Sequence, residues 1–141
     1  MQIEGSGANS GGLKSVAQFS PQLMDHFKNP RNVGRLNPCD VEGVAGTPGE
    51  GNFMILTLRI DQAIISDIAF QTFGCGPAIA SGSVVTDTLK GKPLSQAQAL
   101  TSDDISQALG GIPPHKLYCA DLAIEALQDA LRKVRMDAPA E

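Results

Sequence analysis

The chain has 141 residues, of which 42% are hydrophobic and only 4% aromatic, and its net charge is −4 at neutral pH. This length fits one domain with a core of its own. The acidic balance argues against a protein that binds a phosphate backbone, and the few aromatic side chains argue against one that stacks bases. No apolar run reaches the roughly 18 residues of a membrane span. We therefore expect neither nucleic acid nor a membrane as a partner.

The two ends of the chain differ in composition from the rest. Residues 1–15 are rich in glycine and serine and show neither the apolar segment of a signal peptide nor the arginines of a transit peptide. We expect a disordered tail over 1–15, one folded domain over 16–136 and a second disordered tail over 137–141. Without a targeting segment, we predict a cytoplasmic protein. The three widely spaced cysteines fit a reduced compartment and do not form a disulfide framework.

The first half of the chain predicts one helix and a small sheet. A helix is expected over 21–29, because Ser20 is a good N-cap and proline suits the first turn. A loop-rich stretch follows, in which 41–46 is a candidate edge strand. Residues 53–60 and 64–73 predict an antiparallel hairpin. One face of its first strand is apolar: Met54, Leu56, Leu58 and Ile60.

The second half of the chain predicts helices. They are expected over 77–90, over 95–100, from a cap at Ser102 to the glycine pair at 110–111, and over 115–134. The last has the clearest helical period in the chain. We therefore predict an α+β fold, in which a small antiparallel sheet of about three strands packs against several helices in a single domain. The periodic apolar positions are Cys119, Leu122, Ala123, Ala126, Leu127, Ala130, Leu131 and Val134.

Two cysteines have similar local settings. Cys75 lies between Gly74 and Gly76, where a strand ends and a helix begins. Glycine permits close approach of other groups, and the start of a helix favours a thiolate. Cys119 lies in the first turns of the last helix, on its inward face. We predict a lowered pKa for both thiols; the alternative for Cys75 is a small core residue in a tight turn.

Four blocks of sequence carry a family resemblance. They are MDHFKNPRNVG at 24–34, GTPGEGNFM at 46–54, TFGCGPAIASGS at 72–83 and PPHKLYC at 113–119. Together they resemble the U-type iron–sulfur cluster assembly scaffolds, the NifU/IscU/SufU kind and its NifU N-terminal-like domain. The resemblance extends from about residue 19 to residue 134, and the first and third blocks are the longest and most specific.

The resemblance implies a site. In that family three cysteines, an aspartate and in many members a histidine converge on an exposed site that holds a nascent cluster or a zinc ion. Position by position, Cys75 and Cys119 match the second and third cysteines, while Glu50 stands at the first. Asn52 replaces the aspartate and Tyr118 the histidine. The resemblance thus implies that Cys75, Cys119 and Glu50 bind iron or zinc, with a transient 2Fe–2S cluster or Zn²⁺ as cofactor.

This set contains too few strong ligands for a cluster, and the sequence leaves open which groups complete it. A 2Fe–2S cluster usually needs four strong ligands, mostly thiolates. A homo-oligomer that pools Cys75 and Cys119 from two copies would supply them. Cys39, in a loop outside the family blocks, is either a free cysteine or a replacement thiolate brought back by its loop. His115, four residues before Cys119, is either a surface group or a further ligand.

The resemblance implies a scaffold or carrier for iron–sulfur cluster assembly, and not an enzyme. Its partners would be a cysteine desulfurase, apo iron–sulfur acceptor proteins and a chaperone, because residues 112–116 match the family's chaperone-recognition stretch. One alternative is a zinc-bound acceptor of persulfide sulfur from the desulfurase. Another is a degenerate binding or regulatory member without metal, given the departures at Glu50, Asn52 and Tyr118. No Ser/His/Asp arrangement in a recognisable context indicates a hydrolase.

Overall fold

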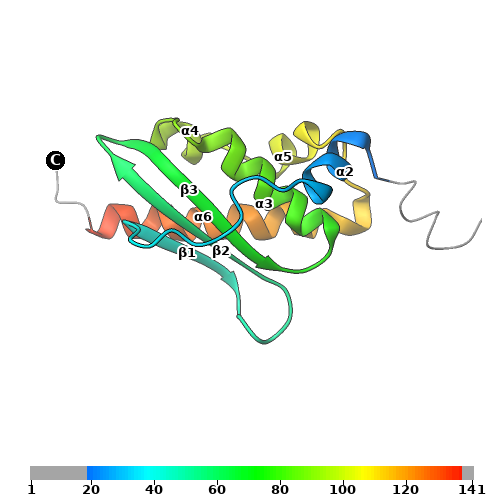
Figure 1. The fold of residues 1–141 in the computed structure, drawn as a ribbon, viewed down its shortest axis with the longest axis horizontal. Helices are drawn as coiled ribbons and strands as arrows, with labels where there is room; N and C mark the ends of the chain where they lie inside the picture. Colours follow the sequence, from blue (N-terminus) through cyan, green and yellow to red (C-terminus); the bar gives the residue numbers. More distant parts are fainter. Residues whose placement is uncertain (1–18, 138–141) are drawn as a thin grey trace, which may run out of the picture.

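The computed structural model describes residues 19–137. The predicted tail at 1–15 lies outside this range, as does the tail at 137–141 except for Asp137, the last residue of a helix. The described elements form the predicted α+β fold in a single domain, a three-stranded antiparallel sheet with five α-helices (Figure 1). In chain order they are α2 (Pro21–Lys28), β1 (Val41–Gly46), β2 (Phe53–Asp61), β3 (Ile64–Phe73), α3 (Gly76–Leu89), α4 (Leu94–Ala99), α5 (Ser102–Ala108), the 3₁₀ turn η1 (Pro114–Lys116) and α6 (Tyr118–Asp137).

The sheet is a meander in the order β1-β2-β3. The predicted hairpin is confirmed, and the candidate edge strand at 41–46 is β1. β1 and β2 pair from Gly46 opposite Phe53 to Val41 opposite Leu58. Since Phe53 also pairs with Phe73, the β1–β2 loop and the end of β3 lie at the same end of the sheet.

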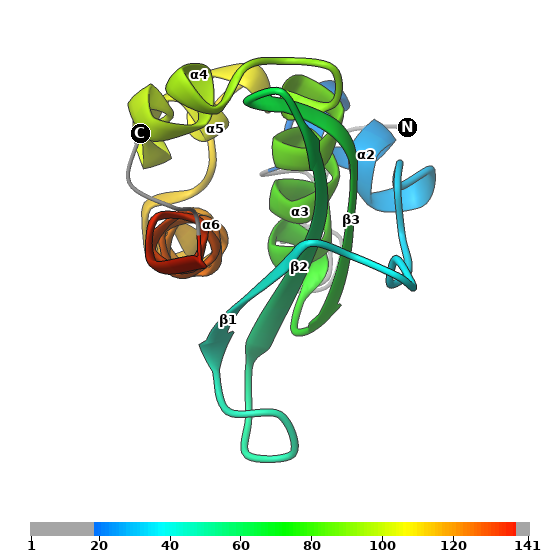
Figure 2. The same cartoon turned by 90° about the vertical axis from the view of Figure 1, so that its left-hand side faces the viewer.

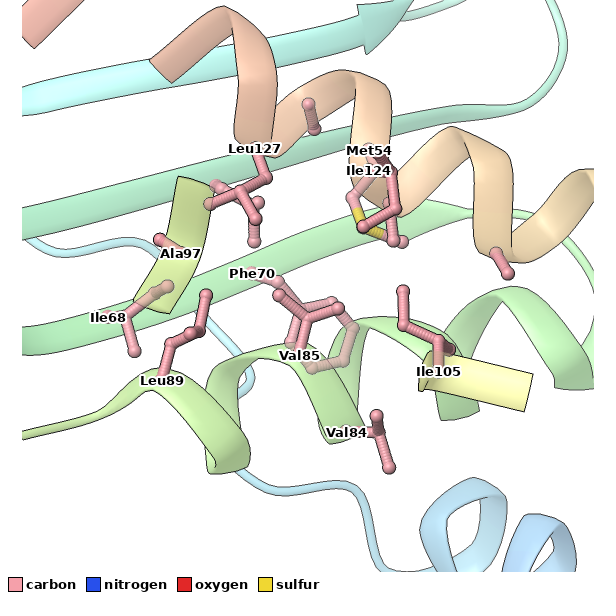
Figure 3. Close-up of a cluster of buried hydrophobic side chains, with 14 of the residues drawn as sticks. Met54, Ile68, Phe70, Val84, Val85, Leu89, Ala97, Ile105, Ile124 and Leu127 are labelled. Carbon is pink, nitrogen blue, oxygen red and sulfur yellow. The ribbon is translucent and has the colours of Figure 1, made fainter. Parts of the chain in front are cut away.

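The core lies between one face of the sheet and the helices (Figures 2 and 3). Met54, Leu56 and Leu58 are all fully buried on that face, as their alternation predicts. α6 lies directly on β1, since a Cβ added to Gly43 would lie 2.1 Å from the carbonyl oxygen of Ala126. Only glycine allows this close approach. Figure 3 shows the strand side chains interleaved with those of α3 and α6.

The chain before β1 covers part of the opposite face of the sheet. The Leu36 backbone N–H donates to Thr57 Oγ1 at 3.0 Å, and Arg59 Nε donates to the carbonyl of Pro38 at 2.8 Å. Thr57 is therefore only 1% exposed although it points away from the helices. The same segment also pairs with the edge of β3, through a parallel β-bridge between Val33 and Phe70. The loop-rich stretch thus contributes to the packing of the sheet.

Four helix starts differ from the prediction. α3 and α4 each begin one residue earlier than expected, at Gly76 and Leu94, and the other two are those of α5 and α6. The cap of α5 is Thr101, not Ser102, because the Thr101 side chain accepts from the Asp104 N–H while the Asp104 carboxylate accepts from the Thr101 N–H. The last helix begins at Tyr118, not at residue 115, since the residues after Pro113 first form η1. None of the helices between residues 19 and 137 is long and apolar enough to cross a membrane.

Candidate metal and sulfur site

The structure brings Cys75 and Cys119 together. Cys75 is the N-cap of α3 and Cys119 is the second residue of α6. The two helices pack against each other, so residues 44 positions apart meet with their Sγ atoms 3.4 Å apart. The pair lies at the end of the sheet where β3 finishes. Two thiols at this distance form either a ligand pair or a redox pair.

The two cysteines differ in exposure. Cys75 is partly exposed, whereas Cys119 is 0% exposed, as its inward position on the helical period predicts. A molecule approaching from solvent therefore meets Cys75 first. Cys119 lies behind it, next to the core residue Ala120.

Polar and aromatic groups surround the exposed sulfur. The Tyr118 hydroxyl lies 3.9 Å from Cys75 Sγ, and Lys116 Nζ lies 5.9 Å from the centre of the Tyr118 ring. The side chain of Asn52 reaches the same turn, because a Cβ added to Gly74 would lie 3.7 Å from Asn52 Oδ1. A hydroxyl and an ammonium thus lie near Cys75, and an amide lies beside the preceding Gly74.

The surroundings of Cys75 favour its thiolate. Burial by itself raises the pKa of this thiol. The hydrogen bond with Cys119, the nearby N–H of Ala78, the Tyr118 hydroxyl and the charge of Lys116 outweigh burial, so the pKa of Cys75 lies below its ordinary value. The predicted lowered pKa is confirmed for this residue, and the position at a helix start supports it.

For Cys119 the predicted lowered pKa is wrong. Burial first, and then the hydrogen bond to Cys75 and its negative charge, raise the pKa of Cys119 to about 12. A helix start cannot compensate for complete removal of the thiolate from water. The pair therefore titrates as a unit, in which Cys75 loses its proton first and the Cys119 S–H donates to the thiolate.

Glu50 lies apart from the cysteine pair. It is exposed on the β1–β2 loop, which projects beyond the body of the molecule (Figures 1 and 2). Among residues 19–137 no group of three or more His, Cys, Asp or Glu side chains is arranged to hold a metal ion. His115 is exposed on η1 and joins no such group.

Cys39 lies at the opposite end of the sheet. The neighbouring Asp40 N–H donates to the carbonyl of Leu58, five residue pairs along the sheet from Phe53 and hence about 17 Å away. Cys39 is exposed and has a free thiol. The fold therefore does not bring Cys39 to the cysteine pair, and the alternative in which its loop folds back is not the arrangement observed.

Sequence reasoning missed two contacts of the site. Tyr118 had been noted only as a departure from the family histidine, yet it is the aromatic neighbour of Cys75. The sequence could have predicted this, because Cys119 faces inward on its helix and the residue before it, Tyr118, therefore faces outward. Phe27, near the end of α2, is the second missed contact. Its ring lies beside Gly76, where an added Cβ would be 3.3 Å away, and it remains 38% exposed.

Comparison with known proteins agrees with this fold. The scaffold protein IscU of Escherichia coli (strain K12), an iron–sulfur cluster assembly protein, is 43% identical over 117 residues, which cover 80% of this chain and 91% of IscU. IscU of Aquifex aeolicus is 41% identical over 121 residues, which cover 84% of this chain and 77% of its own. The crystal structure of a nitrogen-fixing NifU-like protein (N-terminal) from Brucella abortus has the same fold, with a TM-score of 0.71, 15% identity, and coverage of 84% and 95%. Residues 18–139 match the NifU-like N terminal domain, and the chain belongs to that family.

Proposed function

We propose that the protein is a scaffold or carrier for iron–sulfur cluster assembly, which holds the nascent cluster on Cys75 and Cys119. Family membership and relatives named as iron–sulfur cluster assembly scaffolds support the proposal. The single observation that carries it is the 3.4 Å approach of the two Sγ atoms at a partly open surface. The cluster, in the transient 2Fe–2S form, is cargo for this protein, which is not an enzyme.

The sulfur separation suits a shared metal ion. A tetrahedral ion bound at about 2.3 Å from each thiolate holds the two sulfurs about 3.8 Å apart. The observed 3.4 Å is reached from that arrangement by small rotations of the two side chains. Cys75 already favours its thiolate, and an incoming cation would displace the proton of Cys119.

Glu50 is the proposed third ligand. It stands between Gly49 and Gly51, whose φ values are +89° and +104° and around which no atom lies within 4 Å of an added Cβ. A loop of this kind can change conformation without a steric barrier. The C-terminal end of this loop lies near the site, because the side chain of Asn52 lies beside Gly74. Folding of the loop toward Cys75 would add a carboxylate to the two thiolates.

An exposed apolar surface surrounds the site and suits the proposed protein partners. The cysteine desulfurase that delivers sulfur and the acceptor proteins that take the cluster must both reach Cys75. Large apolar side chains are scattered over most surfaces, but a group of them around a reactive residue marks an interaction surface. The group consists of Phe27 (38% exposed), Phe73 (63%), Leu117 (40%) and Tyr118 (45%).

A chaperone is proposed at residues 112–116. Ile112 and Pro113 are buried in this stretch, whereas Pro114 and His115 are exposed. A chaperone that binds this stretch in the folded protein would therefore contact its second half, at Pro114 and His115.

A zinc-bound acceptor of persulfide sulfur is the second candidate. The same two thiolates and carboxylate suit Zn²⁺ with an open fourth position. The partial exposure of Cys75 favours it as the group that takes the sulfur. The two candidates differ in metal content, which an analysis of the isolated protein measures.

The test is anaerobic purification and reconstitution with ferrous iron and sulfide, followed by iron, zinc and sulfide analysis. Wild type is compared with Cys75→Ala and Glu50→Ala, and with Cys39→Ala as a cysteine control remote from the site. Iron with matching sulfide that is lost in Cys75→Ala and kept in Cys39→Ala supports the scaffold. Zinc without sulfide supports the sulfur acceptor. No metal in wild type after reconstitution would overturn both and leave a metal-free binding protein.

A further inference from the structure

The arrangement of the two thiols is suited to chemistry besides metal binding. On the proposed function, sulfur reaches the site from a persulfide, in which the terminal sulfur is at the oxidation level of elemental sulfur. The bridging sulfur of a cluster is sulfide, which is two electrons more reduced. A sulfur atom delivered to this protein must therefore gain two electrons before it enters a cluster. Two thiols in contact are a two-electron reductant, because they yield those electrons when they form a disulfide.

We propose that Cys75 and Cys119 form a dithiol that releases sulfide from a persulfide carried on Cys75. This inference rests on the proposed function, since it assigns the source of the electrons for the same site. It requires only the two side chains whose Sγ atoms lie 3.4 Å apart.

The reaction balances in two steps. In the first, the Cys75 thiolate attacks the terminal sulfur of a donor persulfide, so that Cys75 becomes a persulfide and the donor leaves as a thiol. In the second, Cys119 Sγ attacks Cys75 Sγ, a disulfide bond forms between them, and the bond from Cys75 Sγ to the terminal sulfur breaks. The terminal sulfur leaves with the electron pair and takes up the Cys119 proton as hydrogen sulfide. The two cysteine sulfurs are oxidised and the delivered sulfur is reduced.

Exposure sets the order of the two steps. Cys75 is partly exposed and can reach a persulfide on another molecule, whereas Cys119 is 0% exposed and contacts Cys75 from the inner side. The terminal sulfur on Cys75 therefore points toward solvent while Cys119 approaches the inner sulfur. The departing anion leaves on the side of Tyr118 and Lys116, where a hydroxyl and an ammonium lie near Cys75.

The disulfide must be reduced before the site can bind metal. An external thiol, such as glutathione or a reduced dithiol protein, exchanges with the disulfide and returns both cysteines to thiols while it is itself oxidised. Sulfide release and metal binding at these two residues therefore alternate. The protein would deliver one sulfide per chain for each reduction.

The test uses a small persulfide donor, glutathione persulfide, at one molecule per chain, so that the glutathione released is too little to reduce the disulfide fully. It uses the full chain without metal or added thiol, under anaerobic conditions. All proteins carry Cys39→Ser, so that the exposed remote cysteine takes up no sulfur. Released sulfide is measured against a no-protein blank, and the chain is weighed by intact mass spectrometry. We expect about one sulfide per chain, loss of two hydrogen atoms from the mass, and a Cys75–Cys119 crosslink in a peptide digest.

Variants at the second cysteine separate the steps. Cys119→Ala and Cys119→Ser, the second keeping a polar group of similar size, should gain the mass of one sulfur atom at Cys75 and release sulfide about tenfold or more slowly than the reference protein. Circular dichroism checks that they are folded. Cys75→Ser should gain no sulfur. A reference protein that keeps its persulfide with two free thiols, or a Cys119 variant that releases sulfide at an unchanged rate, would overturn the inference.

A parallel sample distinguishes this inference from the proposed function. The same protein receives ferrous iron and inorganic sulfide, which bypasses the reductive step. Cluster absorption in this sample together with no sulfide release from the persulfide contradicts only the dithiol reaction. Absence of a cluster even with free sulfide contradicts the scaffold function itself, whatever the outcome with the persulfide.

Discussion

Two residues of one type acquire opposite properties in this fold. Cys75 and Cys119 both stand at the start of a helix, and each could gain from the partial positive charge there. Cys75 is only partly buried, and the hydrogen bond with Cys119, the Ala78 N–H and the Tyr118 hydroxyl outweigh that burial, so its pKa is lowered. Cys119 loses water altogether, and burial dominates its pKa. Solvent access, which depends on the packing of α3 against α6, decides which helix start produces a thiolate.

The hydroxyl of Tyr118 gives a test at the residue scale. Tyr118→Phe removes the O–H that lies 3.9 Å from Cys75 Sγ and keeps the aromatic ring. The thiolate loses a donor, so the pKa of Cys75 should rise. The rate of alkylation by iodoacetamide, followed by mass spectrometry between about pH 6 and 10, should reach half its maximum at a higher pH than in the parent protein.

Both proteins carry Cys39→Ser, and alkylation is read at the Cys75 peptide. The parent protein should itself reach its half-maximal rate below the ordinary thiol value of about 8.5, because the pKa of Cys75 is lowered. Identical profiles for the two proteins would show that the hydroxyl does not stabilise the thiolate.

Asp129 gives a second test, in which stability depends on pH. Its carboxylate accepts from the Val44 N–H at 2.9 Å and pairs with Lys133 at 3.0 Å, so it ties α6 to β1. The Val44 hydrogen bond first, and then Lys133 and Arg132, hold the pKa of Asp129 below its usual value. Because the folded pKa is depressed, this stabilisation is present above the unfolded value of about 3.9 and is lost as pH falls through the folded pKa.

The expected effect of Asp129→Asn is a loss of about 0.5–1.5 kcal/mol in the free energy of unfolding at pH 7. It is modest because solvent screens the ion pairs and the amide oxygen can still accept from Val44. The loss should shrink as pH falls below about 4. Urea unfolding at several pH values measures it, with Asp61→Asn at the exposed end of β2 as control. A loss that stays constant down to pH 2 contradicts the linkage.

At the scale of elements, the β2–β3 turn is the most strained part of the sheet. Gln62 and Ala63 have φ values of 52° and 65°, the left-handed conformation at both central positions of a two-residue hairpin turn. Glycine takes this conformation without a steric penalty, whereas alanine does not. Ala63→Gly should therefore raise the free energy of unfolding by up to about 1 kcal/mol.

The measurement is chemical denaturation of Ala63→Gly beside wild type. Ala69→Gly in the middle of β3 is the control, because its backbone is regular and its side chain is buried. It should lower stability. The same sign for both variants would mean that the turn conformation is not the source of the strain.

Elements whose signals are local could be predicted from the sequence. The cap at Ser20, the alternation along β2 and the helical period of α6 each lie within a few residues of the element that they define. The exact cap of α5 could not, because Thr101 and Ser102 are equally good hydroxyls and only the reciprocal bonds with Asp104 select one. The start of α6 was missed because the residues that follow Pro113 first form the 3₁₀ turn η1, and the α-helix begins only at Tyr118.

The candidate site was predictable in its residues and not in its properties. Family blocks identified Cys75 and Cys119, but their 3.4 Å contact and the burial of Cys119 arise from packing between helices distant in sequence. The position of Glu50 illustrates the same limit. Glu50 aligns with the family's first cysteine, but the alignment does not predict the position of its carboxylate, because the flanking glycines allow the loop many conformations. Contacts of high sequence separation determine these features, and a local pattern does not encode them.

At the scale of the whole molecule, the number of ligands argues for two copies. The described part of one chain offers two thiolates at the site, and a 2Fe–2S cluster usually needs four strong ligands. Two chains related by a twofold axis would supply four thiolates and would cover the same apolar side chains on each copy. Phe73, 63% exposed beside the site, lies where such an interface would form.

The expected outcome is one cluster per two chains in the reconstituted protein. Light scattering coupled to size exclusion under anaerobic conditions should give twice the mass of the chain, with one iron per chain, and the mass should fall when a chelator removes the iron. Phe73→Ser should weaken the dimer, while Cys39→Ser should leave it unchanged because Cys39 lies at the far end of the sheet. A loaded species with the mass of a single chain and two irons would mean that the chain completes the ligand set by itself. Glu50 is then the first residue to substitute. Among the acidic residues it is the nearest in sequence to Phe53, the start of β2, which pairs with the end of β3 beside the cysteines.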